Sequence, residues 1–73
     1  MVSSMLGTEL RNARLKAGMT QEAVATKARL TREFISQVER DVSSPSVDNL
    51  LKICRAINVP AGTIISRVEK SRP

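Results

Sequence analysis

Apolar residues recur along most of the chain at steps of three and four, the spacing with which an α-helix places side chains on one face. Leu6, Leu10, Ala13 and Ala17 follow this spacing near the start of the chain. It returns in two later runs, Leu50, Ile53, Cys54 and Ile57, then Ala61, Ile64, Ile65 and Val68. No segment alternates convincingly between apolar and polar residues. The pattern therefore predicts an all-α fold without strands.

Residues that favour helix ends divide the chain into five predicted helices. Gly18 suits a helix C-terminus, where a positive φ is needed. Thr20, Thr31 and Ser46 each offer a side-chain oxygen that can cap a helix N-terminus. We expect one domain, residues 1–73, with helices at about 4–17, 21–27, 31–40, 46–57 and 60–69 and a flexible tail at 70–73.

The second and third predicted helices are short and are joined by only three residues, 28–30, which is typical of a helix-turn-helix at about residues 20–40. On the third helix, Ile35 and Val38 point to one side. Polar side chains that can hydrogen-bond base edges gather on the other side: Arg32, Glu33, Ser36, Gln37 and Arg40. An ordinary solvated face is the alternative, and the short capped helix immediately before favours DNA binding.

The charge balance supports a polyanionic partner, because 12 Lys and Arg against 7 Asp and Glu give a formal net charge of +5. Nucleic acid comes first and an anionic membrane second. A membrane-binding helix would need aromatic anchors, and Phe34 is the only aromatic residue. We interpret Phe34 as partly packed against the core, with contact to a thymine methyl or a sugar as the alternative.

Several kinds of chemistry lack the residues they need. With no His and one Cys, the chain offers neither a zinc site of the usual kind nor an internal disulfide. It has no nucleophile–base pair and no glycine-rich phosphate loop, so we expect no enzyme activity, no cofactor and no small-molecule ligand. Cys54 is interpreted as a small core hydrophobe. Without an apolar run of about 20 residues or a signal-peptide pattern, we expect a cytoplasmic protein that does not enter membranes.

Two charged residues flank the apolar sides of their helices, Arg14 on the first and Glu39 on the third. A charge that loses hydration without a partner costs several kcal/mol. Their opposite signs suggest an ion pair, and the equally weighted alternative is that both long side chains reach solvent.

The order and spacing of several residues resemble the lambda-repressor-like (Cro/repressor, Xre) helix-turn-helix family. The residues that carry the resemblance are Leu10-Arg11 with Arg14, Gly18-Met19-Thr20-Gln21, Ala25, Ile35-Ser36-Gln37-Val38-Glu39, Pro45, Leu50, Ile53 and Val59. The resemblance implies five helices, the third of which lies in the DNA major groove. It also implies an arginine–glutamate pair at Arg14 and Glu39. Two positions depart from the family, which usually has glycine where this chain has Arg29 and Asp41.

The resemblance also assigns roles to individual residues. It places base reading on Arg32, Glu33, Ser36 and Gln37, and contacts to the DNA backbone on Gln21, Thr31, Ser43 and Ser44. Lys27 and Arg29, beside the connection, could also contact the backbone, with solvent as the equally weighted alternative for each. We add Lys27 and Arg40 to the expected backbone contacts. Among family members the chain looks most like controller proteins of restriction–modification systems, which share an arginine at the position of Arg32, an aromatic two residues later and Ile35-Ser36.

We therefore expect a transcriptional regulator that acts as a homodimer on a two-fold-related operator in double-stranded DNA. RNA polymerase is a candidate further partner. Surplus apolar residues near the C-terminal half predict the dimer interface at Leu51, Ile65 and Val68, beside Val47. The alternatives are a phage-type repressor and an antitoxin of the same fold that also binds a protein toxin.

Overall fold

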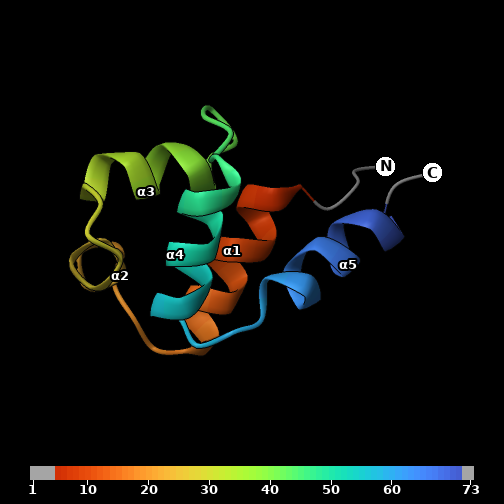
Figure 1. Cartoon of the computed structure of the whole chain (residues 1–73), viewed down its shortest axis with the longest axis horizontal. Helices are drawn as coiled ribbons and strands as arrows, with labels where there is room; N and C mark the ends of the chain where they lie inside the picture. The colour runs from red at the N-terminus through yellow and green to blue at the C-terminus, as the bar shows by residue number, and fades with distance from the viewer. Residues whose placement is uncertain (1–4, 72–73) are drawn as a thin grey trace.

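The computed structural model describes residues 5–71, most of which lie in five helices (Figure 1). These are α1 (Leu6–Lys16), α2 (Gln21–Ala28), α3 (Arg32–Glu39), α4 (Val47–Ala56) and α5 (Ala61–Ser71). Residues 5–71 contain no strand. The predicted all-α, five-helix fold is confirmed.

Three helices begin with the side-chain caps that the sequence predicted, Thr20, Thr31 and Ser46. Each hydroxyl accepts a hydrogen bond from the backbone N–H three residues later, at 3.0, 3.0 and 3.1 Å respectively. These bonds satisfy N–H groups that have no partner inside the helix. The starts of α2, α3 and α4 are thus fixed by single polar residues.

Four helices end in the same way, with one residue at a positive φ directly after the last turn. The residues are Gly18 (φ 72°), Arg29 (59°), Asp41 (59°) and Asn58 (58°). In each case the next N–H donates to a carbonyl five residues earlier, as from Leu30 to Ala25 at 2.9 Å. Arg29 and Asp41 therefore keep the turns for which the family usually has glycine. The left-handed conformation costs a non-glycine residue such as Arg29 about 1–2 kcal/mol.

The observed helix bounds differ from the predicted ones mainly at the C-terminus. The helix α5 continues through Ser71, so the tail predicted from residue 70 is wrong for residues 70 and 71. Neither residue breaks a helix, and Lys70 in the last turn complements the helix dipole. Residues 72–73, the rest of the predicted tail, lie outside the described residues, as does residue 4, the predicted start of the first helix.

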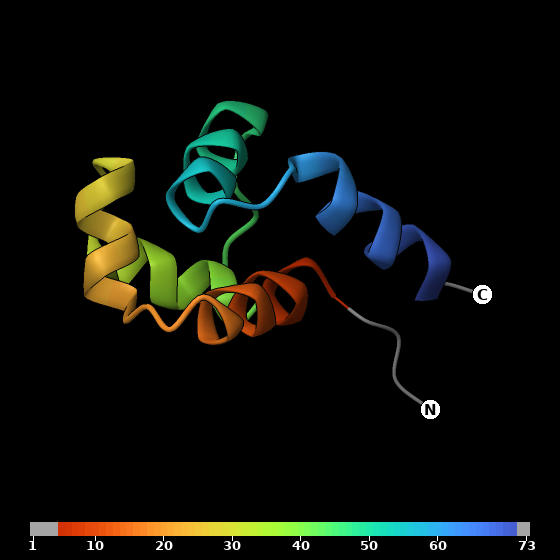
Figure 2. The same ribbon diagram turned by 90° about the horizontal axis from the view of Figure 1, so that it is seen from below.

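The core lies where α1, α2, α3 and α4 meet, and α5 closes it on the side away from α2 (Figures 1 and 2). Its most buried large side chains are Leu10, Val24, Ile35, Val38, Cys54 and Ile64. Phe34 is half-buried and packs against this core, as predicted. Burial also raises the pKa of the Cys54 thiol, in agreement with its interpretation as a core residue.

The start of α1 lies very close to the end of α3. A Cβ added at Gly7 would lie 2.6 Å from the carbonyl oxygen of Glu39, and closer still to that of Val38. Only glycine allows this approach without moving the backbone of one helix. Between residues 5 and 71 no helix is both long and apolar enough to cross a membrane.

Candidate nucleic-acid interface

One side of α3 is buried and the other faces solvent. Ile35 and Val38 are 1% and 2% exposed and hold the helix on the core. The opposite side carries the predicted base-reading residues, of which Arg32 and Glu33 are exposed and Ser36 and Gln37 are half-buried. In Figure 1, α3 lies at the upper left of the molecule, above α2.

The inner end of α3 is tied to α1 and α2 by a buried polar network. Arg14 Nε donates to Glu39 Oε2 at 2.6 Å, and Arg14 Nη2 donates to Glu39 Oε1 at 3.0 Å. Each residue is only 8% exposed. The predicted ion pair is therefore present, and its two parallel hydrogen bonds fix the orientation of both side chains.

Gln21, at the first turn of α2, joins this network. Its Nε2 donates to Glu39 Oε1 at 3.1 Å, while Arg14 Nη1 donates to the Met19 carbonyl at 2.8 Å. An amide nitrogen carries two hydrogens, so the bond to Glu39 uses only one of the two donors of Gln21 Nε2. The sequence had suggested the phosphate role of Gln21 but gave no sign of its bond to Glu39.

Two further predicted DNA-contacting side chains are held by bonds at the end of α3. Ser43 Oγ donates to Gln37 Oε1 at 3.2 Å, which links the loop after α3 to a predicted base-reading residue. Arg40 Nε donates to the Ser36 carbonyl at 3.3 Å, so this guanidinium lies along its own helix. Ser44 and Lys27 are exposed, as is Thr31 at the start of α3.

A shallow hollow lies beside Gln21, between α1 and α3. Arg11, Arg14, Gln21, Ser36, Glu39 and Arg40 line it. Arg11 was not predicted as a contact, although it stands three residues before Arg14 and therefore on a neighbouring position of α1. With Arg14 already paired to Glu39, Arg11 and Arg40 leave this hollow positively charged.

Asp41 has a structural role that the sequence did not predict. The backbone N–H of Gly7 donates to Asp41 Oδ1 at 3.0 Å. The N-cap residue of α1, Met5, makes no side-chain cap bond. Asp41 therefore caps α1 from 34 residues away and holds the loop after α3 against the start of that helix.

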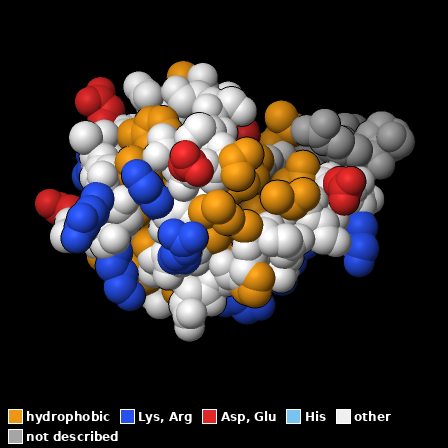
Figure 3. Space-filling view, viewed as in Figure 1, with side chains coloured by type: hydrophobic (Ala, Val, Ile, Leu, Met, Phe, Trp, Pro, Cys, Tyr) orange, Lys and Arg blue, Asp and Glu red, His pale blue; other side chains and the backbone are white. Residues whose placement is uncertain are grey.

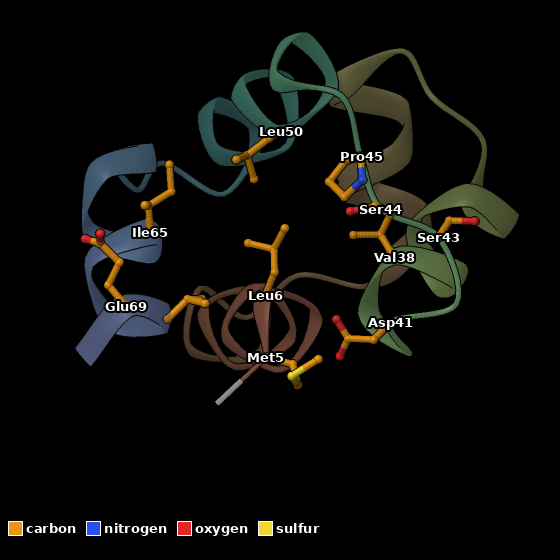
Figure 4. A pocket seen from close by; sticks show the side chains of 11 residues that line it. Met5, Leu6, Val38, Asp41, Ser43, Ser44, Pro45, Leu50, Ile65 and Glu69 are labelled. Carbon is orange, nitrogen blue, oxygen red and sulfur yellow. The ribbon is translucent and has the colours of Figure 1, made fainter. Parts of the chain in front are cut away.

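The predicted dimer-interface residues lie on a partly apolar surface over α4 and α5 (Figure 3). Val47 is 72% exposed and Ile65 is 45% exposed, while Leu51 and Val68 are half-buried. Leu6, Leu50 and Ile65 point into a hollow of about 450 Å³ beside this surface, between α1, α5 and the loop before α4 (Figure 4). The molecule thus exposes large apolar side chains near α5 that no described residue covers.

Comparisons with known proteins agree with this geometry. Residues 10–64 match the helix-turn-helix protein family. The HTH-type transcriptional regulator ImmR of Bacillus subtilis is 37% identical over 67 residues, an alignment that covers 92% of this chain and 53% of ImmR. The chain therefore spans about half the length of that relative.

Two controller proteins are also similar. Control protein C.BamHI of Bacillus amyloliquefaciens is 39% identical over 56 residues, which cover 75% of this chain and 69% of the relative. The crystal structure of the restriction-modification controller protein C.AhdI from Aeromonas hydrophila superposes with a TM-score of 0.78 at 30% identity, covering 81% of this chain and 89% of that one.

The sequence match extends from within α1 into α5 and includes both capped helices and the turn between them. The chain therefore belongs to the lambda-repressor-like helix-turn-helix family.

Proposed function

We propose that the chain is a sequence-specific transcriptional regulator that reads its operator with α3. The observation that carries this proposal is the division of α3 into a buried apolar side and an open polar side. The Arg14–Glu39–Gln21 network supports it, because it fixes α3 relative to the first turn of α2 without using the outer polar residues.

Arg32, Glu33, Ser36 and Gln37 are the proposed base-reading residues. Arginine can bind guanine O6 and N7 with two hydrogen bonds, and glutamine can do the same with adenine N6 and N7. The proposed backbone contacts are Gln21, Thr31, Lys27, Arg40, Ser43 and Ser44. Each lies at the first turn of α2, beside the turn before α3 or just after α3.

The regulator would act as a homodimer through α4 and α5. The exposed apolar side chains Val47 and Ile65, with Leu51 and Val68 beside them, supply the surface. The two copies of α3 would then enter successive major grooves on one side of the duplex, about 34 Å apart. A controller role in restriction–modification is the narrower proposal, supported by the similarity to C.BamHI and C.AhdI.

Selection of bound sequences from a pool of random duplexes tests the DNA-reading proposal. It should return a motif with two-fold symmetry and half-sites about one helical turn apart. A pool that gains no shared motif would contradict the proposal.

Sedimentation tests the dimer with a matched pair of variants. Wild-type protein should be dimeric at tens of micromolar and Ile65→Asp monomeric, because the new carboxylate would be buried without a partner. Leu15→Asp is the control, since Leu15 is similarly exposed at 53% but lies on α1. A monomeric wild type, or equal behaviour of the two variants, would contradict the interface.

A further inference from the structure

Four basic side chains surround a second hollow, on the side of the molecule where α2 and α4 end. Lys27 and Arg29 come from the end of α2 and its C-cap, and Lys52 and Arg55 come from α4. The small buried residues Ala28 and Ala56 complete the lining. We call these four residues the α2–α4 basic cluster. Figure 3 shows Lys and Arg side chains gathered on this part of the surface.

The cluster has no anionic partner in the part of the chain that the structure describes. All four side chains are exposed, and none makes a hydrogen bond or a salt bridge to another described residue. No acidic residue lines the hollow. By contrast, Arg14 is fully paired and Arg40 bonds a carbonyl of its own helix.

Helix dipoles explain only part of this accumulation of charge. The C-termini of α2 and α4 meet here, and each carries about −0.5 of an elementary charge. Lys27 and Arg55 lie in the last turns, where that charge favours cations. Four cations against about −1 still leave a local charge of about +3. The helix dipoles therefore leave most of the positive charge at this hollow uncompensated.

The cluster holds four of the 12 Lys and Arg residues of the chain. On α3 and its C-cap, Glu33 balances one of the two arginines, Arg32 and Arg40, because Glu39 is already paired with Arg14. The helix and its C-cap therefore carry about one net positive charge, and the cluster would add to this attraction for phosphates.

We infer that the α2–α4 basic cluster binds the phosphodiester backbone of the duplex beyond the N-terminal end of α3, an inference that rests on the proposed function. The cluster includes Arg29, which lies three residues before Arg32, and α2 packs against both α3 and α4, so the cluster begins beside the N-terminal end of α3. It extends the contact proposed at Lys27 to the neighbouring Arg29 and to Lys52 and Arg55 on α4. In this arrangement α3 would read the bases, and the cluster would provide much of the salt-dependent part of the affinity.

Binding to a labelled 30-base-pair duplex of random sequence, measured by fluorescence anisotropy at increasing KCl, tests this inference without any knowledge of the operator. The variant is Lys52→Gln with Arg55→Gln, two exposed residues outside the proposed base-reading set. The control is Lys16→Gln with Lys70→Gln, which removes two exposed cations from α1 and α5. Melting followed by circular dichroism checks that both variants fold.

Each phosphate contact contributes about 0.9 to the slope of log affinity against log salt, which is about eightfold in affinity at 0.1 M salt. The cluster variant should therefore lose about 1.8 from the slope and about 60-fold in affinity, and the control should lose much less. Equal losses in the two variants would mean that only net charge matters and would overturn the inference.

Two further arms locate the contact. The selected operator can be shortened by removing base pairs outside the half-sites. This shortening should lower the affinity of the wild-type protein and leave the affinity of the cluster variant unchanged. Decaglutamate added to the wild-type–DNA complex should not bind through the cluster, because DNA occupies it. If decaglutamate binds the wild-type–DNA complex and does not bind the complex of the cluster variant, an acidic protein segment is the better partner. That result would overturn the inference.

Discussion

Replacement of Glu39 by alanine would remove three acceptor contacts from the junction of α1, α2 and α3. Arg14 would lose both bonds to the carboxylate, at 2.6 and 3.0 Å, and Gln21 would lose its bond at 3.1 Å. Only the bond from Arg14 to the Met19 carbonyl would remain. Because Arg14 is 8% exposed, its charge would be left buried without a counter-ion.

Loss of one member of a buried ion pair costs roughly 3–5 kcal/mol. A 73-residue chain is expected to have a total stability of about 4–11 kcal/mol. The substitution Glu39→Ala should therefore remove a large fraction of the stability, and urea unfolding followed by circular dichroism would measure it. Glu39→Gln should lose less, because the amide oxygen still accepts hydrogen bonds.

A double-mutant cycle separates the contribution of the Arg14–Glu39 ion pair to stability from the contribution of side-chain packing. The double variant Arg14→Ala with Glu39→Ala leaves no buried charge unpaired, so its loss should be smaller than the sum of the single losses by more than about 1 kcal/mol. Additive losses, or a Glu39→Ala loss below about 1 kcal/mol, would refute the reasoning.

Three smaller predictions concern the backbone around this junction, each checked by the free energy of unfolding in urea. Asp41→Ala removes the remote cap of α1 and should cost about 1 kcal/mol, whereas Asp41→Asn, which keeps an acceptor oxygen, should cost less; equal losses would argue against the cap. Arg29→Gly relieves the positive φ and should stabilise by about 0.5–1 kcal/mol, after allowance for the greater entropy of the unfolded chain, and a loss would contradict strain at that turn. Gly7→Ala should destabilise by at least about 1 kcal/mol, because its Cβ meets backbone atoms of α3, while Gly62→Ala, with open space around it, should not.

The elements that depend on local chemistry could be predicted from the sequence. A cap depends on one residue and its neighbours, so Thr20, Thr31 and Ser46 could be identified as helix starts. The buried side of α3 follows from the spacing of Ile35 and Val38 in the same way. Asp41 and Arg29 were harder to interpret, because the turn overrides the intrinsic preference of the residue that occupies it.

Contacts between segments that are distant in the sequence were harder to predict. The two charges at Arg14 and Glu39 suggested a pair, but periodicity alone left solvent as an equal alternative until the family resemblance favoured the pair. The bond from Gln21 to Glu39 and the cap from Asp41 to Gly7 depend on how helices cross, which periodicity does not encode. The α2–α4 basic cluster could not be predicted for the same reason, because Lys27 and Arg55 come together only when α2 packs on α4.

The most direct test of base reading by α3 is the affinity of Arg32→Ala for a panel of duplexes that each carry one changed base pair in the selected operator. The variant should lose about 1–3 kcal/mol of discrimination at one base pair of each half-site and keep the wild-type preferences elsewhere. Lys27→Gln, a proposed backbone contact, should weaken binding to every duplex by a similar factor. An Arg32→Ala loss that is uniform across the panel would contradict the claim that α3 reads the operator.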